Sequence, residues 1–491
     1  MTFTITTSLS CALISISIWI IYLNRKRPGK LPPGPKGYPL VGNIFQLQNR
    51  PWHTFVEWKK TYGDIIYLRL FNQDVIVLNS AKVAGDLLDR RAANYSQRFH
   101  MPVTDYLVGG LNIAYINPGV TWRSMRRAAR EALNIKASTH YYPMQMRGGI
   151  QFARDIFTAL ESASLIYNHS SHERVAEFKD FINSLVDSGS PGKYLANHVP
   201  ILEHLPDFMS KWKRDSKAKH RAQTEKFLSY FLPIKEATLQ KRETGSSFCS
   251  MLAKMQEQVC LNDLESAWLA AAMCIAAFET TETTLNWLVL AMITFPEVQR
   301  KAQEELDRVI GRARIPTLND LDSLSYMRAV VKEVLRWRPA LPTSLFHASL
   351  EDDIYEGYYI PKGCLVIPNV LAINHDEEIY GPNPDEFRPE RFLNEDDTHK
   401  PSPPDTKDEG HHTFGFGHRI CSGRHLAFNT LFTFAIVLWA MHLEAGKDGD
   451  EISTEDEAYG ITSQTRKYSV STRARFPEAL EMLNLAKEEW L

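Results

Sequence analysis

Cysteine is scarce in this 491-residue chain. The six cysteines lie far apart, and no two of them form a CxxC pair. This low density excludes a disulfide-stabilised scaffold, and it predicts that the bulk of the protein is reduced and cytosolic.

An excess of charge of either sign is also lacking. Lys and Arg number 56 and Asp and Glu number 58, which leaves a formal net charge of −2 at pH 7. No long basic stripe is interleaved with aromatic residues, so we expect no nucleic-acid partner. Internal repeats are absent as well. The hydrophobic content of 44% is sufficient for a large buried core, and the length alone would allow about three domains.

Charged side chains are absent from Met1 to Leu23, and cations follow at Arg25 to Arg27. As a helix this stretch reaches roughly 34 Å, which exceeds a hydrocarbon core of about 30 Å. Positive charge after the apolar stretch predicts a cytoplasmic C-terminal side. A cleaved signal peptide is the alternative, but neither a charged start nor an A-x-A-like cleavage site is evident. We expect residues 1–24 to be a transmembrane signal-anchor.

Proline and glycine fill the segment Pro28–Pro39, where no helix or sheet can continue. We therefore expect residues 25–43 to be a basic and proline-rich tether. The globular domain is expected at residues 44–491.

Helices dominate the expected secondary structure, and strands form a small part of it. The long run of apolar and small residues from Asp263, which can cap a helix, to about Thr294 predicts a helix that crosses the whole core. A β-hairpin is expected at residues 65–71 and 75–79. Further helices are expected at about 81–90, between 121 and 255, from 296 to just before Gly311, at 325–337 and at 425–441. Short strands are expected at 358–360 and 364–367, and an exposed loop at 394–410.

One cysteine lies in the glycine-rich segment Phe414-Gly-Phe-Gly-His-Arg-Ile-Cys-Ser-Gly423, which leads into an apolar run. Glycines permit close backbone approach to a planar macrocycle, and N–H groups at a helix start can face a thiolate. A lone cysteine is more often a small buried hydrophobic residue. The residues that fit the haem-binding pattern FGxGxRxCxG of the cytochrome P450 superfamily are Phe414, Gly415, Gly417, Arg419, Cys421 and Gly423. The chain resembles this superfamily over essentially its whole length.

The resemblance implies a single, mainly α-helical P450 domain that holds haem b, with the Cys421 thiolate as axial ligand of the iron. Glu333 and Arg336 match the ExxR motif of the superfamily. Arg391 lies in Phe387–Phe392, which resembles its PERF segment. An isolated Glu/Arg pair at i and i+3 is normally a surface pair. With the third member present, the resemblance implies a buried structural network.

Candidates for contacts with the haem propionates come from three places. Trp122 and Arg126 resemble the WxxxR motif of the superfamily, and Arg419 and His347 are further candidates. Arg126 alone could also belong to a solvated basic face. The candidates for docking an acidic flavoprotein are the neighbouring Arg123, Arg127 and Arg130.

The segment Ala276–Thr281 resembles the oxygen-activation motif A/G-G-x-D/E-T-T. Glu279 and Thr280 would then be the acid and alcohol pair that delivers protons to bound oxygen. Without the other motifs, Glu-Thr-Thr in a helix would not indicate a site of oxygen activation. Ala277 replaces the usual glycine, and its methyl group could alter the groove for oxygen or substrate.

Two further departures from the family pattern stand out. Ala348 follows His347 where the family commonly has arginine, so no propionate contact is assigned to Ala348. The region 144–187 looks shorter than expected, and the usual apolar helix does not continue cleanly through it.

By resemblance, the reaction converts a substrate RH to ROH and water with O2 and two electrons. No flavin or nicotinamide fingerprint occurs, so the electrons would come from a separate NADPH-cytochrome P450 reductase in the endoplasmic reticulum membrane, with the catalytic domain on the cytoplasmic side. One alternative is a haem-thiolate isomerase or dehydratase that needs no reductase, although Glu279 and Thr280 count against it. A non-catalytic haem protein is the other, motivated by the short region 144–187.

The segments Leu31–Asn43, Pro51-Trp52 and Val75–Ser80 resemble fungal microsomal members such as the O-methylsterigmatocystin oxidoreductases, which act largely in secondary metabolism. The substrate pocket is expected to draw on residues 103–116, 274–278, 341–346 and 460–463, which are mostly apolar. A lipophilic substrate is therefore expected, and a terpenoid is favoured.

Overall fold

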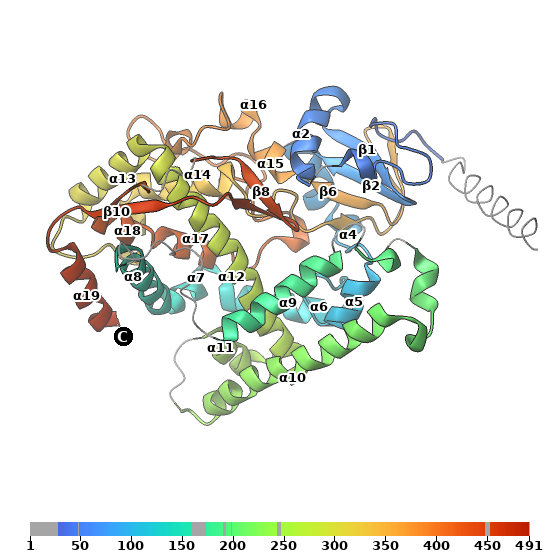
Figure 1. Ribbon diagram of the computed structural model, residues 1–491, viewed down its shortest axis with the longest axis horizontal. Helices are drawn as coiled ribbons and strands as arrows, with labels where there is room; N and C mark the ends of the chain where they lie inside the picture. The colour runs from blue at the N-terminus through green and yellow to red at the C-terminus, as the bar shows by residue number, and fades with distance from the viewer. Residues whose placement is uncertain are drawn as a thin grey trace, which may run out of the picture.

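The computed structural model describes residues 28–47, 49–158, 173–189, 193–197, 199–242, 247–446 and 452–490. The expected signal-anchor at 1–24 and the start of the tether lie outside these residues. Within the described ranges, no helix is both long and apolar enough to cross a membrane. Helices dominate and strands form a small part, so the predicted fold class is confirmed (Figure 1).

The helices before the centre of the chain are α2 (Pro51–Tyr62), α3 (Ala81–Ala84), α4 (Ala92–Tyr95), α5 (Pro102–Val108), α6 (Val120–Leu133), α7 (Ile135–Ser138), α8 (Tyr142–Thr158), α9 (Glu173–Gly189), α10 (Lys211–Leu239) and α11 (Phe248–Met255). Those that follow are α12 (Asp263–Thr294), α13 (Pro296–Val309), α14 (Ser325–Trp337), α15 (Val370–Asn374), α16 (Glu377–Tyr380), α17 (Arg424–Phe432), α18 (Ala435–Ala440) and α19 (Ala479–Trp490). The strands are β1 (Ile65–Leu70), β2 (Gln73–Leu78), β3 (His347–Ala348), β4 (Asp353–Tyr355), β5 (Tyr358–Ile360), β6 (Leu365–Pro368), β7 (Met441–Ala445), β8 (Asp456–Tyr459), β9 (Thr462–Thr465) and β10 (Val470–Ala474).

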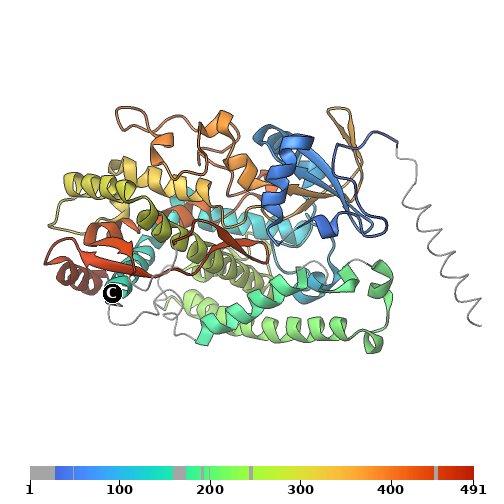
Figure 2. The ribbon, with the colours of Figure 1, turned by 45° about the horizontal axis from the view of Figure 1, so that its top comes forward.

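The largest sheet has the strand order β1-β2-β6-β3 and lies with α2 at one end of the molecule (Figures 1 and 2). β1 and β2 form the expected hairpin, in which Ile65 pairs with Leu78. β6 joins β2 in parallel, so this strand comes from a distant part of the chain. Residues Val75–Leu78 are all completely buried, which explains why β2 has a continuous apolar run and no alternation.

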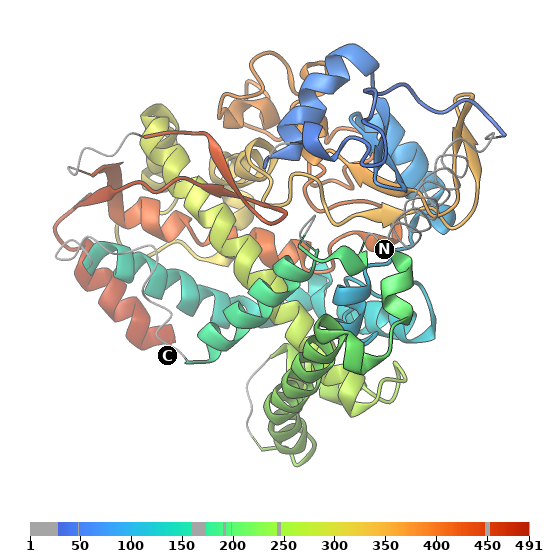
Figure 3. The same cartoon turned by 45° about the vertical axis from the view of Figure 1, so that its right-hand side comes forward.

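The long helix α12 runs from Asp263 to Thr294, as expected. Its cap is Asn262 and not Asp263, because the Asn262 side chain accepts the Glu265 N–H (2.9 Å) and the Glu265 carboxylate accepts the Asn262 N–H (3.0 Å). One end of α12 packs in an apolar cluster with α5, α6, α9 and α10, and the other end packs in a second cluster with α13, α14 and α18. Figures 2 and 3 show it crossing the middle of the molecule.

The prediction of a single helix at 425–441 is wrong. The run breaks into α17 and α18, and its last residue, Met441, begins β7. At the break, the Thr433 hydroxyl donates to the carbonyl of Thr430 (2.6 Å). All residues of α18 are buried. A run that is apolar on every side carries no helical periodicity that could reveal such a break.

Candidate functional site

The glycine-rich loop before α17 holds Cys421 in a fixed position. The Cys421 N–H donates to the carbonyl of Phe414 (2.8 Å), and the Gly415 N–H donates to the carbonyl of His412 (3.0 Å). Gly417 has φ +52°, and a Cβ at this position would lie 2.0 Å from the carbonyl oxygen of Leu88. Only glycine fits there, so this residue lets the loop pack against the π-helical segment Gly85–Arg90.

Accessible residues occur at two places that adjoin the buried core, at Cys421 and in the middle of α12. Cys421 is accessible, although its loop leads into a helix whose end is part of the apolar core. Ala276 and Ala277 in the middle of α12 are accessible as well, although both ends of this helix are buried in the core. Burial raises the pKa of the Cys421 thiol, whereas the Gly423 N–H and the charge of Arg126 favour the thiolate.

Three arginines lie close to one another beside the cysteine loop. Arg126 donates to the Ser422 hydroxyl (2.7 Å) and to the carbonyl of Ile420 (2.9 Å) in the cysteine loop. Arg419 donates to the carbonyl of Ser96 (2.9 Å), and Arg98 donates to the carbonyl of Phe346 (2.7 Å).

No carboxylate of the described residues forms an ion pair with any of the three. Burial lowers the pKa of each guanidinium, and the positive charge of nearby arginines lowers it further. Buried charge of one sign without a partner is unfavourable, so this cluster fits a ligand that carries carboxylates.

Trp122 and His347 lie at the same cluster. The Arg419 guanidinium lies 4.6 Å from the centre of the Trp122 ring, and the buried indole N–H of Trp122 has no hydrogen-bond partner among the described residues. The Nδ1 atom of His347 lies 2.7 Å from the carbonyl oxygen of Tyr95. Burial and the charges of Arg98 and Arg419 lower the pKa of His347 to about 3, so its ring is neutral.

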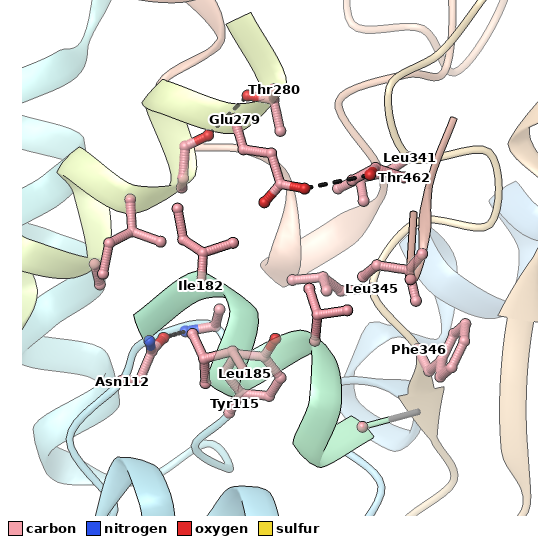
Figure 4. A pocket seen from close by; sticks show the side chains of 18 of the residues that line it. Asn112, Tyr115, Ile182, Leu185, Glu279, Thr280, Leu341, Leu345, Phe346 and Thr462 are labelled. Carbon is pink, nitrogen blue, oxygen red and sulfur yellow. Dashed lines mark hydrogen bonds between the residues drawn. The ribbon is translucent and has the colours of Figure 1, made fainter. Parts of the chain in front are cut away.

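Glu279 and Thr280 lie on the side of α12 that borders a cavity (Figure 4). The Thr280 hydroxyl donates to the carbonyl of Ala276 (2.7 Å), and the Thr462 hydroxyl donates to the Glu279 carboxylate (3.2 Å). Burial raises the pKa of Glu279, and the hydrogen bond from Thr462 opposes this shift. A raised pKa lets a carboxyl group keep its proton at a higher pH, which suits a residue that delivers protons.

The hairpin β8–β9 that carries Thr462 is fastened to α2 by one buried carboxylate. Asp456 accepts hydrogen bonds from the Trp52 indole (2.8 Å) and the Ser463 hydroxyl (3.1 Å), and its other oxygen lies 2.7 Å from the His53 ring. Burial alone would raise its pKa, but these partners lower the pKa of Asp456 to about 2.

The cavity has a volume of about 250 Å³. All four expected segments contribute to its wall, so the prediction that they surround one cavity is confirmed, and substrate binding there stays a prediction. α9 lines it as well, through Ile182, Leu185 and Val186, a contribution that sequence reasoning missed. The lining is mostly apolar, as expected for a lipophilic ligand.

Glu333, Arg336 and Arg391 lie together in the core. The Arg336 guanidinium donates to both oxygens of Glu333 (2.7 and 2.8 Å), and neither side chain is accessible. Arg391 Nε lies 3.4 Å from a Glu333 oxygen. Arg336 also donates to the carbonyl of Asn374 (2.9 Å), and the Asn374 side chain accepts the N–H of His412 (2.9 Å). The ion pair is therefore connected to the residues just before the cysteine loop.

The sequence profile of the family described as "Cytochrome P450" matches residues 32–145 and 162–472. The chain belongs to the cytochrome P450 family. It is 36% identical over 501 residues to a cytochrome P450 monooxygenase of Armillaria gallica (97% of this chain, 96% of the relative). It is 41% identical over 471 residues to cytochrome P450 monooxygenase 58 of Postia placenta (91% and 88%), and 33% identical over 544 residues to cytochrome P450 monooxygenase iboC of Amanita muscaria (91% and 95%).

This P450 is therefore a monooxygenase, and membership of the family implies haem with a cysteine thiolate as its axial ligand. The residues present fit that group. The accessible thiol of Cys421 meets the need for a thiolate, and the arginine cluster without carboxylate partners meets the need for two propionates.

Sequence reasoning missed Arg98, which has no motif around it. Its guanidinium donates to the carbonyls of Ala114 (2.7 Å) and Leu345 (2.9 Å), which are far apart in the sequence. Arg98 also lies close to Ala348, because the Ala348 N–H donates to the carbonyl of Gln97 (2.9 Å). Arg98 therefore supplies a positive charge close to Ala348, whose own side chain carries none.

Proposed function

We propose that Cys421 is the thiolate ligand of haem and that this P450 hydroxylates a lipophilic small molecule, with a terpenoid favoured. The observation that carries the proposal is the accessible Cys421 thiol, which shares the interior with a cluster of arginines without carboxylate partners and with Glu279 and Thr280 of α12. Each turnover consumes O2, two electrons and two protons, and converts RH to ROH and water.

The residues of the chain have separate tasks in this reaction. Arg98, Arg126, Arg419 and Trp122 would hold the propionates and so fix the plane of the haem. His347 lies beside them, but the single N–H of its neutral ring already donates to the carbonyl of Tyr95, so it has no donor for a propionate. Haem, when bound, supplies the activation of O2. Glu279 would deliver protons through its carboxyl group, and the Thr280 hydroxyl would pass them on at the edge of the cavity. The apolar wall excludes water from the reacting carbon.

NADPH-cytochrome P450 reductase is the proposed electron donor. Arg123, Arg127 and Arg130 are exposed on α6, the helix whose Arg126 contacts the cysteine loop. An acidic flavoprotein that docks on this basic face would come close to the cysteine side of the haem.

A single-pass anchor in the endoplasmic reticulum membrane belongs to the same proposal, with residues 44–491 on the cytoplasmic side. The uncharged stretch before Arg25 supports it. Fractionation of the full chain and of a chain that begins at residue 28 tests it, because only the full chain should remain with membranes after alkaline extraction.

The alternative function that the same site could support is that of a haem-thiolate isomerase or dehydratase. It would need neither a reductase nor a proton-delivering pair. Glu279 and Thr280 both line the cavity, which favours the monooxygenase.

Titration of the purified ferric protein with terpenoids and polyketide intermediates tests the proposal. Ligands that displace the axial water should produce a saturable shift of the Soret band from the low-spin to the high-spin position. The same ligands should then support product formation that is coupled to NADPH consumption and depends on the reductase. Turnover of a bound ligand without the reductase would contradict the monooxygenase, and saturable binding by polyketides alone would contradict the terpenoid.

A further inference from the structure

Tyr115 is a cavity residue for which the proposed chemistry so far has no use. It lies between α5 and α6, and its side chain lines the same cavity as Glu279 and Thr280. Figure 4 shows its ring across the cavity from these two residues, next to Leu185 of α9.

The backbone around Tyr115 is held firmly by the arginine cluster. Arg98 Nε donates to the carbonyl of Ala114 (2.7 Å), and Arg419 donates to the carbonyls of Ile113 (3.2 Å) and Ile116 (2.7 Å). The Tyr115 N–H itself donates to the carbonyl of Asn112 (3.0 Å). Fixed backbone on both sides places the phenol ring in the cavity without further ordering, which is a favourable starting point for binding.

The Tyr115 hydroxyl forms no hydrogen bond with any described residue, and the same holds for the Tyr380 hydroxyl in the core, whereas three other largely buried tyrosines are hydrogen-bonded. Tyr95 donates to Asp353 (2.8 Å), Tyr326 donates to Glu390 (3.0 Å), and Tyr468 donates to the carbonyl of Asn286 (2.8 Å). A hydroxyl group inside an apolar cavity needs a partner, and here the partner has to come from the contents of the cavity.

Burial raises the pKa of Tyr115, the charge of Arg98 opposes this shift, and nearby Glu279 adds to it. The phenol is therefore neutral at physiological pH and offers one O–H donor. Its natural partner is a neutral oxygen acceptor. Since the rest of the wall is mostly apolar, this acceptor is attached to an apolar skeleton.

We propose that Tyr115 donates a hydrogen bond to an oxygen atom of the substrate, and that the substrate is a lipophile that already carries a hydroxyl or carbonyl group. This inference rests on the proposed function, because it places the reacting carbon beside Thr280 and the existing oxygen on the Tyr115 side. A reaction that installs an alcohol or ketone must then precede this enzyme. A water molecule on Tyr115 is the competing occupant.

Matched ligand pairs test the proposal on the haem-loaded enzyme. The oxygenated probes are borneol, camphor and cedrol, and the matched hydrocarbons are bornane and cedrane. The dissociation constant of each is measured from the Soret shift and independently by calorimetry, for the wild type and for Tyr115→Phe. We expect the wild type to bind the oxygenated members more tightly. Tyr115→Phe should weaken their binding roughly 2- to 12-fold and leave hydrocarbon binding unchanged.

Tyr106→Phe is the matched control, because Tyr106 packs against Trp212 and Lys213 and is not part of the cavity wall. It should leave the affinity for every probe as in the wild type. The proposal is overturned if the wild type does not prefer the oxygenated probes, if none of them binds, or if Tyr115→Phe weakens both members of each pair equally, as water on Tyr115 predicts. After any of these outcomes, the spectrum of the reduced carbonyl complex of the wild type shows which proposal has failed. If it is the thiolate type, only the inference about Tyr115 fails. If it is not, the proposed function fails.

Discussion

Replacement of Glu333 by glutamine removes the charge on which Arg336 and Arg391 converge. In the native protein Glu333 accepts two hydrogen bonds from Arg336 and one from the N–H of Arg388 (2.8 Å), and neither Glu333 nor Arg336 is accessible. The glutamine amide has only one acceptor oxygen, so its NH2 group would face a guanidinium N–H. Loss of one partner of such a buried pair costs about 3 to 5 kcal/mol, because the remaining charge stays buried without compensation.

Urea unfolding followed by tryptophan fluorescence measures this cost, and the haem content of the purified variant measures the effect on the cysteine loop. The control is Glu57→Gln, which breaks the Glu57–Lys60 pair of the same i,i+3 spacing on the surface. We expect a large loss of unfolding free energy and lower haem content for Glu333→Gln, and almost no change for the control. Similar, small effects of the two substitutions would refute the argument that burial makes this network essential.

Three further predictions concern the loop, the hairpin and the docking face. Gly417→Ala should prevent normal haem loading, because the added methyl group would lie 2.0 Å from a backbone carbonyl oxygen. The control Gly148→Ala, where a Cβ has open space, should load haem normally. Haem absorbance per amount of protein measures the loading of both variants. Asp456 has a folded-state pKa of about 2, below the unfolded value of about 3.9, so its contribution to stability is complete above about pH 4 and is lost as pH falls through 2. Acid unfolding of Asp456→Asn should lack this component, and an unchanged acid profile would be the contrary result. Charge reversal of Arg123 and Arg127 together should raise the reductase concentration needed for half-maximal turnover about tenfold and weaken its salt dependence, and unaltered reductase kinetics would exclude this face.

Long helices with clear ends were predictable from the sequence. The bounds of α12 and α14 agree with the expectation, because their patterns are long and proline residues follow them. The cap at Asn262 was missed since Asp263 is an equally good capping residue one position later. The break between α17 and α18 was missed because α18, which is buried on every side, lacks periodicity.

The candidate site was predictable where its residues are neighbours in the sequence. The cysteine loop and the Glu279-Thr280 pair each lie within one short segment. Arg98 and the α9 wall were missed because they reach the site only through the fold, from segments with no motif of their own. Tyr115 lay inside an expected pocket segment, but the lack of a partner for its hydroxyl becomes visible only when the surrounding side chains are placed.

The central claim is that the Cys421 thiolate binds the haem iron. The absorption spectrum of the reduced carbonyl complex tests it most directly, with wild type and Cys421→His compared at equal haem content. We predict the red-shifted Soret band of a thiolate complex for the wild type, and the band of an imidazole complex for Cys421→His. A wild type without the thiolate band, or a variant that keeps it, would contradict the account.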